Sequence, residues 1–540
     1  MIQDNKILIA KGENPIYMHT DKVNRHGLIA GATGTGKNFT LKVMAEGLSD
    51  MGVPIFLADV KGDVSSMALA GEKSDAIVKR LEKMNIDPES YHPHSYPCRF
   101  WDVFEKNGIP VRAKVSDIGP VLLSRLLGLT EVQEGVLNIA FHFADDNGWE
   151  LIDFKDLTAL LTYVAEHRSE LTTTYGSVST QSVGAIQRAL LNLKDEGAEE
   201  FFGEPALNIE DWIKTNENGK GYVNILHCVE LSQQPLLYAT FMLWMLSDLY
   251  ERLPEVGDLE KPKLAFFFDE AHLLFKNAPK ALTDKVTQVV KLIRSKGVGV
   301  YFISQTPSDI PDDVLSQLNN RVLHALRAYT PADQKAVKAA AQGFRPNPAF
   351  KTEDAIQELE TGEALISLLD ENGAPSIVEK ALICPPESGS AALESAAWAM
   401  MVAQDPAYTA YKDAVDNISA YEKISQLDEA EEASDKEAKV AKVQAQAEKA
   451  KARADKEAEK ALQAKYKAEG RDKYGRTAVQ ASLEKAAKSA VKTETRTIGR
   501  NVAKQITRGI LGTSNNTVGR MASNAAGSLL SDLVGSFFKR

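Results

Sequence analysis

The sequence predicts an α/β protein with a mostly parallel sheet, an all-helical insertion and a long helical C-terminal arm. A phosphate-loop pattern, G-x-x-x-x-G-K, occupies residues 31–37 between an apolar run and a helix-like segment. Further apolar runs end in polar residues, as buried parallel strands do when a site lies at their carboxyl ends. From about residue 117 to 214, apolar residues recur at spacings of three and four, which indicates helices.

Length and composition describe an ordinary globular protein. The 540 residues suggest roughly two to four domains, and the apolar content of 44% is usual. Cys98, Cys228 and Cys384 lie far apart, which fits a reducing compartment better than a disulfide framework. The first ten residues show no secretory leader, and no apolar run approaches the roughly 20 residues that span a bilayer. We therefore expect a cytoplasmic protein.

Charge is distributed unevenly along the chain. The net charge is −11, yet residues 471–540 contain 13 Lys and Arg against 4 acidic residues. A basic tail on an acidic body is typical of an interaction tail. Apolar residues recur among the basic ones in this tail, as they do in an interfacial helix. Docking to a membrane surface, which would make the protein peripherally membrane-associated, and an oligomer contact both fit this pattern.

The N-terminal part contains a strand–loop–helix–strand unit. Residues 1–25 favour a small β-hairpin, and residues 26–30 predict the first core strand. After the loop, residues 39–48 predict a helix and residues 53–60 a buried strand that contains Asp59 near its end. This order is a βαβ unit, which places the loop at the carboxyl end of a parallel strand.

Strand signals return after the predicted helical insertion. Residues 222–226 predict a strand and residues 234–250 an apolar helix, followed by a strand at 263–268 that ends in two acids. The remaining strand signals are residues 298–303, residues 321–327 and a closing β-ribbon at 363–384.

Changes in pattern divide the chain into six parts. These are residues 1–116 and 215–385 for the two parts of the core, 117–214 for the helical insertion, 386–406 for a linker, 407–469 for a charged helical arm and 470–540 for a basic amphipathic tail. The arm contains no Gly or Pro and has a thin Ala/Val seam. A weak coiled coil and a solvated or partly disordered arm are both consistent with it.

The loop is suited to hold a nucleotide phosphate. Its glycines let backbone N–H groups face an anion, Lys37 adds a positive charge, and the following helix adds its dipole. The pattern requires Ser or Thr after the lysine to bind Mg²⁺, but this chain has Asn38 there. The predicted nucleotide-binding residues are Gly31, Ala32, Thr33, Gly34, Thr35, Gly36, Lys37, Asn38 and Phe39.

ATP hydrolysis also needs a metal and an activated water. Asp269, at the end of an apolar strand, is the predicted Mg²⁺ partner together with Asn38, and Glu270 is placed to polarise the water. A helix N-cap followed by a first-turn acid would explain the same pair without catalysis. Gln305, which follows another strand, is a candidate sensor of the γ-phosphate.

Positive charge from an arginine contributes roughly 10³–10⁵ in rate when it stabilises the transition state. Arg294, Arg321 and Arg327 lie beside predicted core strands, and Arg321 and Arg327 rank first because they flank one strand. Such an arginine would reach the site of a neighbouring subunit. A surface arginine paired with an acid is the alternative for each of the three.

Several segments together resemble the HerA/FtsK branch of P-loop ATPases. They are residues 25–37, Asp269-Glu270-Ala271-His272, Arg294 with Gly297, and Ser304-Gln305-Thr306-Pro307. Residues 312–338 closely resemble the bacterial YjgR-type HerA-like ATPases within that branch. The resemblance covers residues 1–385 and continues loosely into the tail.

This resemblance implies a RecA-like core, ring assembly that is often hexameric, and ATP-driven translocation of DNA or another polymer. It implies ATP and Mg²⁺ as cofactors, with Lys37 on phosphate, Asp269 on the metal, Glu270 on the water and Gln305 as sensor. Asn38 departs from the family's Thr or Ser, and its amide oxygen lacks the usual geometry of the hydroxyl. We therefore expect nucleotide binding to survive and turnover to fall, and Asn38→Thr to raise ATPase activity.

Two other motifs have plainer explanations. Residues 269–272 read Asp-Glu-Ala-His, the box after which one helicase group is named, but no paired arginine motif follows, so we expect His272 to pack in the core or to support a neighbouring site residue. His92, His94 and Cys98 are close enough in sequence to ligate zinc, but no second cluster completes four ligands.

Two functions therefore compete. The first is a ring motor that moves DNA or a related polymer, although an acidic body is unfavourable for a DNA channel. The second is a nucleotide-dependent scaffold with weak hydrolysis, docked through its basic tail to a protein or a membrane surface. Asn38 and the amphipathic terminus favour the scaffold.

Overall fold

The computed structural model describes residues 2–3, 5–257, 259–276, 278–469 and 489–490. The chain forms two units, residues 1–424 and residues 425–540. The basic tail predicted at 470–540 lies outside the described residues except for Ser489 and Ala490. No helix of the described part is long and apolar enough to cross a membrane.

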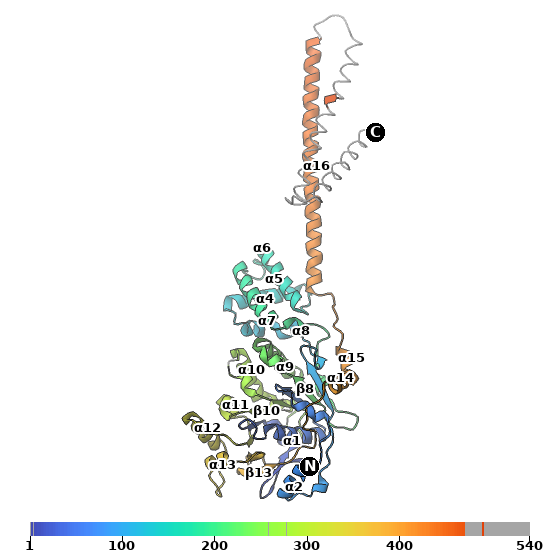
Figure 1. Cartoon of the computed structure of the whole chain (residues 1–540). Helices are drawn as coiled ribbons and strands as arrows, with labels where there is room; N and C mark the ends of the chain where they lie inside the picture. Colours follow the sequence, from blue (N-terminus) through green and yellow to red (C-terminus); the bar gives the residue numbers. More distant parts are fainter. Residues whose placement is uncertain (1, 4, 258, 277, 470–488, 491–540) are drawn as a thin grey trace. The chain divides into compact units, whose positions relative to one another are not determined.

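A sheet of 13 strands runs through the first unit (Figure 1). The strands are β1 (Ile2–Gln3), β2 (Lys6–Lys11), β3 (Pro15–His19), β4 (Gly27–Ala30), β5 (Ile55–Asp59), β6 (Cys98–Asp102), β7 (Ile109–Pro110), β8 (Val223–His227), β9 (Leu264–Phe268), β10 (Val298–Ser304), β11 (Asn320–Leu323), β12 (Glu363–Ser367) and β13 (Glu379–Ile383). Their order across the sheet is β1-β2-β13-β12-β11-β4-β10-β9-β5-β8-β6-β7, and β3 pairs with β2.

The middle of the sheet is parallel, from β11 through β4, β10, β9, β5 and β8 to β6. Its strands are apolar and buried on both faces; all five residues of β9, for example, are buried. Because these strands are parallel and in register, the segments that follow β4, β10, β9 and β5 meet at one edge. The predicted RecA-like α/β core is confirmed.

The antiparallel part extends the sheet beyond β11. β12 pairs with β11 and with β13, which is the predicted closing ribbon. β2 and β3 form the predicted N-terminal hairpin, and β2 pairs with β13. The two ends of the core sequence are therefore joined by strand pairing.

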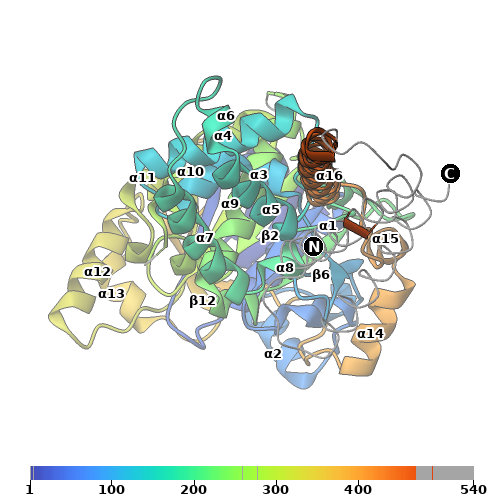
Figure 2. The ribbon, with the colours of Figure 1, turned by 90° about the horizontal axis from the view of Figure 1, so that it is seen from above.

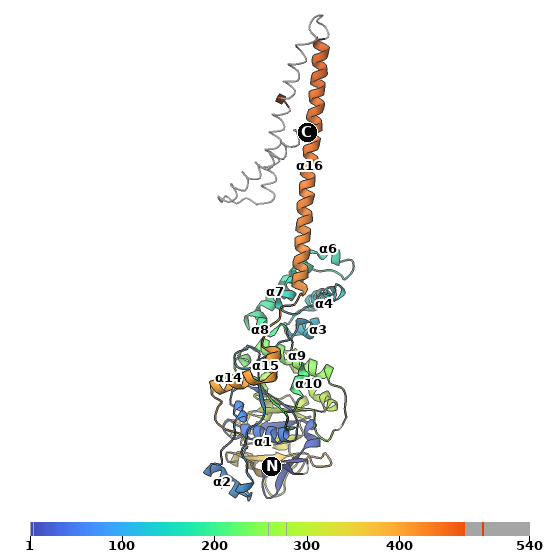
Figure 3. The same ribbon diagram turned by 90° about the vertical axis from the view of Figure 1, so that its right-hand side faces the viewer.

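The helices of the described residues cover the sheet, form the insertion or make up the arm (Figures 1 and 3). They are α1 (Lys37–Asp50), α2 (Asp75–Lys83), α3 (Val115–Leu126), α4 (Glu131–Asp146), α5 (Phe154–Glu166), α6 (Arg168–Leu171), α7 (Thr180–Asp195), α8 (Ala198–Phe201), α9 (Pro235–Arg252), α10 (Lys280–Leu292), α11 (Asp312–Leu315), α12 (Pro331–Gln342), α13 (Thr352–Glu358), α14 (Ser395–Gln404), α15 (Pro406–Tyr411) and α16 (Ala420–Glu469).

The helical insertion is confirmed as α3 to α8, which lie between β7 and β8 in the chain. Its helix starts follow local capping rules. At the start of α4, for example, the Thr130 hydroxyl accepts from the N–H of Gln133, and the Gln133 side chain accepts from the N–H of Thr130. Figures 1 and 3 show α4 to α7 gathered at the end of the first unit that is remote from α2.

The predicted long helical arm is α16, of 50 residues. It begins at Ala420, because the preceding residues form the separate helix α15 and an irregular segment. From residue 426 onward its described side chains are mostly exposed, in keeping with its charged composition. In the first unit, Figure 2 shows α12 and α13 on one side and α14 with α15 on the other.

Residues 385–389, where the sequence favours a linker, are buried against α1. The Glu46 carboxylate accepts hydrogen bonds from the backbone N–H groups of Glu387 at 2.8 Å and Ser388 at 3.0 Å. Lys42 Nζ donates to the carbonyl of Gly389 at 2.9 Å. The helix that follows the phosphate loop therefore holds residues 387–389 through two buried ionisable side chains.

This burial predicts a pH-dependent stability. Burial raises the pKa of Glu46 to about 7, although its hydrogen bonds to Ser388 and Glu387 act in the opposite direction. The folded protein therefore retains a proton that the unfolded chain releases above about pH 4.5. As pH rises from about 5 to 8, the free energy of unfolding of the wild type should fall relative to Glu46→Gln, by up to about 3 kcal/mol.

Denaturant unfolding of both proteins at the two pH values measures this difference. Glu360→Gln, which removes a carboxyl group whose side chain is 72% exposed, is the matched control. A difference between wild type and Glu46→Gln that does not change with pH would contradict the prediction.

Candidate active site

The glycine-rich loop between β4 and α1 is fixed to the ends of two neighbouring strands. The N–H of Gly31 donates to the carbonyl of Ser304 at 3.2 Å, and the N–H of Ala32 donates to the carbonyl of Ala325 at 2.9 Å. A Cβ at position 31 would lie 2.5 Å from the Cβ of His324, and Gly36 has a φ of 113°. Both positions therefore require glycine.

Lys37, the first residue of α1, is buried beneath this loop. Its Nζ donates to the carbonyls of Gly31 at 2.6 Å and Ala32 at 3.1 Å. Burial lowers the pKa of Lys37, and the charge of Lys61 lowers it further. A phosphate at the loop would offer this ammonium stronger, charged acceptors than the two carbonyls.

Polar groups behind the loop hold it in place. His324, just after β11, contacts the Thr40 hydroxyl through Nε2 at 2.8 Å and the Glu363 carbonyl through Nδ1 at 3.0 Å. Burial lowers the pKa of His324 to about 4, so the ring is neutral at pH 7. Because a carbonyl only accepts, Nδ1 donates and Nε2 accepts from Thr40. The sequence showed His324 only as one residue of a strand-like run.

Asp269 and Glu270 follow β9, which is separated from β4 by β10. Asp269 is 2% exposed, and its Oδ2 accepts no hydrogen bond within the described residues. Burial raises the pKa of Asp269 to about 6, against the opposing charge of Lys61. A buried carboxylate oxygen that accepts no hydrogen bond is a suitable ligand for a hard divalent cation.

Glu270 has a left-handed backbone, with φ 47° and ψ 49°. Non-glycine residues seldom adopt this conformation, and it occurs preferentially at functional sites. Glu270 Oε1 lies 2.5 Å from Lys61 Nζ. Burial alone would raise the pKa of Glu270, but the hydrogen bond and charge of Lys61 outweigh it and hold the pKa below its usual value.

The turn after β5 brings Lys61 and Asp63 into the same group of side chains. Buried Asp59, the last residue of β5, fixes the turn by accepting from the N–H groups of Gly62 at 2.7 Å and Val64 at 3.2 Å. Burial, then the charge of Asp63, raises the pKa of Asp59 to about 7. The sequence pattern gave no role to Lys61 or Asp63; their position after a strand that ends in an acid was the available signal.

Asn38 is part of this group as well. Its Nδ2 donates to Asp63 Oδ2 at 2.6 Å. The next residue, Phe39, is 49% exposed, and the tip of the loop at Thr33 and Gly34 is exposed too. The Thr35 hydroxyl instead donates back to the carbonyl of Ala32 at 2.7 Å, within the loop.

Gln305 and the three predicted arginines differ in exposure and in the groups that they contact. Gln305 directly follows β10 and is exposed at the same edge of the sheet. Arg321 donates through three nitrogens to the backbone carbonyls of Leu318, Gly343 and Leu315. Arg327 is exposed and donates to the carbonyl of Gln357 at 3.1 Å. Arg294 is half-buried and lies in the 3₁₀ turn that follows α10.

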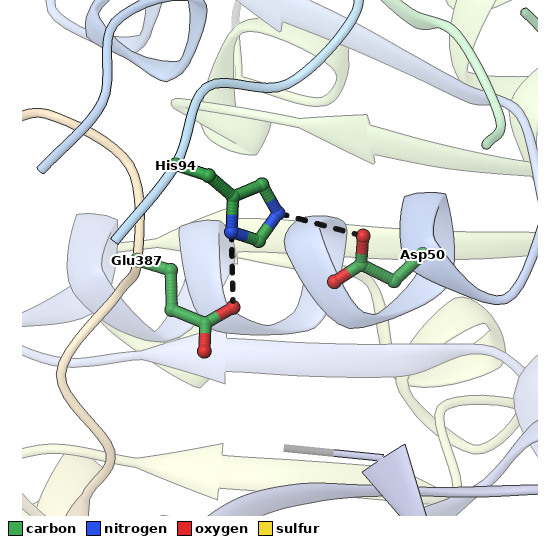
Figure 4. A group of neighbouring side chains, drawn as sticks. All are labelled: Asp50, His94 and Glu387. Atoms are coloured by element: carbon green, nitrogen blue, oxygen red, sulfur yellow. Dashed lines mark ion pairs between the residues drawn. The ribbon is translucent and has the colours of Figure 1, made fainter. Parts of the chain in front are cut away.

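His272 and His94, which belong to the two motifs not expected to act in catalysis, both lie beside carboxylates. His272 Nδ1 lies 3.2 Å from Glu270 Oε2. His94 lies between Asp50 and Glu387, with its ring nitrogens 3.6 Å and 3.8 Å from their carboxylates (Figure 4). The Lys220 ammonium, 2.7 Å from Asp50, already balances charge there. Among the described residues, neither His92 nor Cys98 belongs to this potential metal-binding group.

The residues at the edge of the sheet fit a nucleotide with its metal. The loop offers backbone N–H groups and an ammonium to phosphate, and Asp269 offers Mg²⁺ a carboxylate oxygen that accepts no hydrogen bond within the described residues. The Asn38 carbonyl oxygen is a further ligand of the type that hard cations accept.

Comparison by sequence with known proteins gives a family model and relatives that share the name HerA. The family model for the helicase HerA-like C-terminal region matches residues 4–518. The DNA double-strand break repair helicase HerA of Saccharolobus solfataricus is 23% identical over 375 residues, which cover 67% of this chain and 66% of that protein. The protein of the same name from Pyrococcus furiosus is 24% identical over 389 residues, with 64% and 63% covered. The chain spans just under two thirds of the length of these relatives.

Among solved structures, the bacterial conjugative coupling protein TrwB aligns with a TM-score of 0.49 and 15% identity. The alignment covers 73% of this chain and 92% of that chain. VirB4 of Thermoanaerobacter pseudethanolicus aligns with a TM-score of 0.45 and 15% identity, over 71% and 97% of the two chains.

Proposed function

Because the chain belongs to the helicase HerA-like C-terminal family, we propose that it is an ATPase that couples ATP hydrolysis to the movement of DNA or a related polymer. One observation carries this proposal. The glycine-rich loop with Lys37, the buried carboxylate of Asp269 and the ionised Glu270 lie at one edge of one parallel sheet. The chemistry of ATP hydrolysis needs these three elements together.

The site residues are proposed to have separate roles in ATP binding and hydrolysis. The loop N–H groups and Lys37 would hold the phosphates, and Asp269 with Asn38 would hold Mg²⁺, which would supply positive charge against the charge that develops during hydrolysis. Glu270 stays ionised at pH 7 because Lys61 pairs with it, so its carboxylate can accept a proton from the attacking water. Gln305, at the end of the strand between the two groups, is proposed to contact the γ-phosphate.

We further propose that the chain assembles into a ring, with a hexamer favoured, and that an arginine of one subunit completes the site of the next. Arg327 suits this role best, because it is exposed and follows the strand next to β4. DNA is the favoured polymer, since the relatives from Saccharolobus solfataricus and Pyrococcus furiosus are named DNA double-strand break repair helicases. Cytoplasmic location, and docking to a membrane or protein through the tail, remain predictions.

The second candidate is a nucleotide-dependent scaffold with weak hydrolysis. The observation that favours it is Asn38, whose amide donates to Asp63 where the usual pattern has a hydroxyl for the metal. Steady-state ATP hydrolysis with and without DNA distinguishes the two functions. Turnover that DNA stimulates supports the motor, and nucleotide binding without turnover supports the scaffold.

A further inference from the structure

Asp63 is the residue to which the out-of-pattern Asn38 is joined. Asn38 Nδ2 donates to Asp63 Oδ2 at 2.6 Å. An amide that donates through its nitrogen has only its oxygen left for a cation. Asn38, the residue after the loop lysine, is therefore hydrogen-bonded to a carboxylate. The side chains of Asn38 and Asp63 form one hydrogen-bonded pair next to the phosphate loop.

The backbone that carries Asp63 is held firmly. Asp59 accepts from the N–H groups on either side of it, those of Gly62 and Val64. The Asp63 carbonyl accepts from the Ser66 hydroxyl at 2.9 Å. The carboxylate of Asp63 is exposed rather than packed into the core. A fixed backbone with an accessible carboxylate is what a metal-binding position requires.

A second, independent feature marks the same place as a cation site. Asp269 Oδ2 is buried and accepts no hydrogen bond within the described part of the chain. β5 and β9 pair in parallel with Ala58 opposite Phe268, so the turn that carries Asp63 and the residue Asp269 follow the ends of adjacent strands. Two carboxylates at adjacent strand ends, one of them buried without a hydrogen bond on Oδ2, form a site that favours a divalent cation.

The nearby lysines Lys61, Lys42 and Lys37 bind mainly to other groups, so they do not take the place of a cation at Asp63 and Asp269. Lys61 Nζ is 2.5 Å from Glu270 but 3.9 Å from Asp269, so its closer partner is Glu270. Lys42 Nζ donates to the Ser66 hydroxyl and to the carbonyl of Gly389. Lys37 donates to the loop carbonyls. Asp63 and Asp269 thus lack a closely bound cation among these three lysines.

We propose that Asp63 is a further metal-binding residue of this site, which supplies a carboxylate oxygen to the coordination shell of the nucleotide-bound Mg²⁺ in place of the missing hydroxyl. Asn38 positions Asp63 through the hydrogen bond from its amide. The proposal rests on the proposed function only in requiring that the loop binds a nucleotide. It explains how a chain with Asn38 retains a site for the metal.

The test measures metal binding directly, without turnover. Mn²⁺ replaces Mg²⁺ and is titrated by electron paramagnetic resonance into the full chain saturated with a non-hydrolysable ATP analogue. Asp63→Asn should weaken Mn²⁺ binding roughly 10–100-fold, the usual cost of losing a residue that supports a metal site. Binding of the analogue without metal should stay close to that of the wild type. Asp313→Asn, at a side chain that is 75% exposed, is the matched control.

The double variant Asn38→Thr/Asp63→Asn decides whether Asp63 replaces the hydroxyl. It should recover most of the Mn²⁺ affinity that Asp63→Asn loses, and its recovery would also show that the chain folds without Asp63. Wild-type affinity in Asp63→Asn would overturn the proposal, and so would a double variant as weak as Asp63→Asn. If the wild type fails to bind the analogue at all, the proposed function fails instead.

Discussion

Glu270→Gln is expected to lower the rate of ATP hydrolysis by roughly 10²–10⁴, the usual contribution of a general base. Glutamine has nearly the same shape but cannot accept the proton of the attacking water. Glu270 is suited to that role because Lys61 lies 2.5 Å away and keeps its pKa below the usual value. Steady-state phosphate release at saturating ATP and Mg²⁺ measures the effect.

Nucleotide affinity should change little in this variant, because the phosphates are proposed to be held by the loop N–H groups and Lys37, and not by Glu270. Glu360→Gln, at an exposed carboxylate, is the control and should hydrolyse ATP like the wild type. A Glu270→Gln protein with wild-type turnover would show that another residue activates the water.

Arg327→Ala should have the other large effect, a loss of roughly 10³–10⁵ in turnover if Arg327 acts on the transition state of a neighbouring subunit. Arg327 is exposed, and in the described part of the chain it donates to the backbone carbonyl of Gln357. Arg321, in contrast, donates to three carbonyls of its own chain. Phosphate release is again the measurement, and Arg345→Ala, at another exposed arginine, is the matched control.

Mixing the two inactive variants tests whether the arginine acts between subunits. A Glu270→Gln subunit still offers Arg327, and an Arg327→Ala subunit still offers Glu270, so some interfaces of a mixed ring contain both groups. Part of the activity should return on mixing, and mass measurement with ATP present should show the oligomer. No recovery in a confirmed mixed oligomer would mean that Arg327 does not serve a neighbouring site.

Local patterns predicted most of the core correctly, because each depends on residues close together in sequence. Alternating runs predicted the hairpin of β2 and β3, and helical spacing predicted the insertion from α3 to α8. The spacing of Gly31, Gly36 and Lys37 predicted a loop that the structure places between β4 and α1. The polar ends of β9 and β10 meet the loop because their strands are parallel.

Contacts between distant segments were not predictable in this way. The composition of residues 385–390, rich in Pro, Ser and Gly, indicates a linker, yet residues 385–389 are buried. Nothing local shows that Glu46, about 340 residues earlier, accepts from their backbone N–H groups. Asp63 was missed for the same reason: its proposed role depends on Asn38, which contacts it from α1, and on Asp269, which follows the neighbouring strand β9.

The most direct test of the proposed motor function is steady-state ATP hydrolysis by the full chain at saturating Mg²⁺, with and without DNA. Glu270→Gln defines the background rate in the same assay. We expect turnover above this background that rises when DNA is added. Bound nucleotide with a rate no higher than that of Glu270→Gln, with or without DNA, would contradict the motor and favour the scaffold.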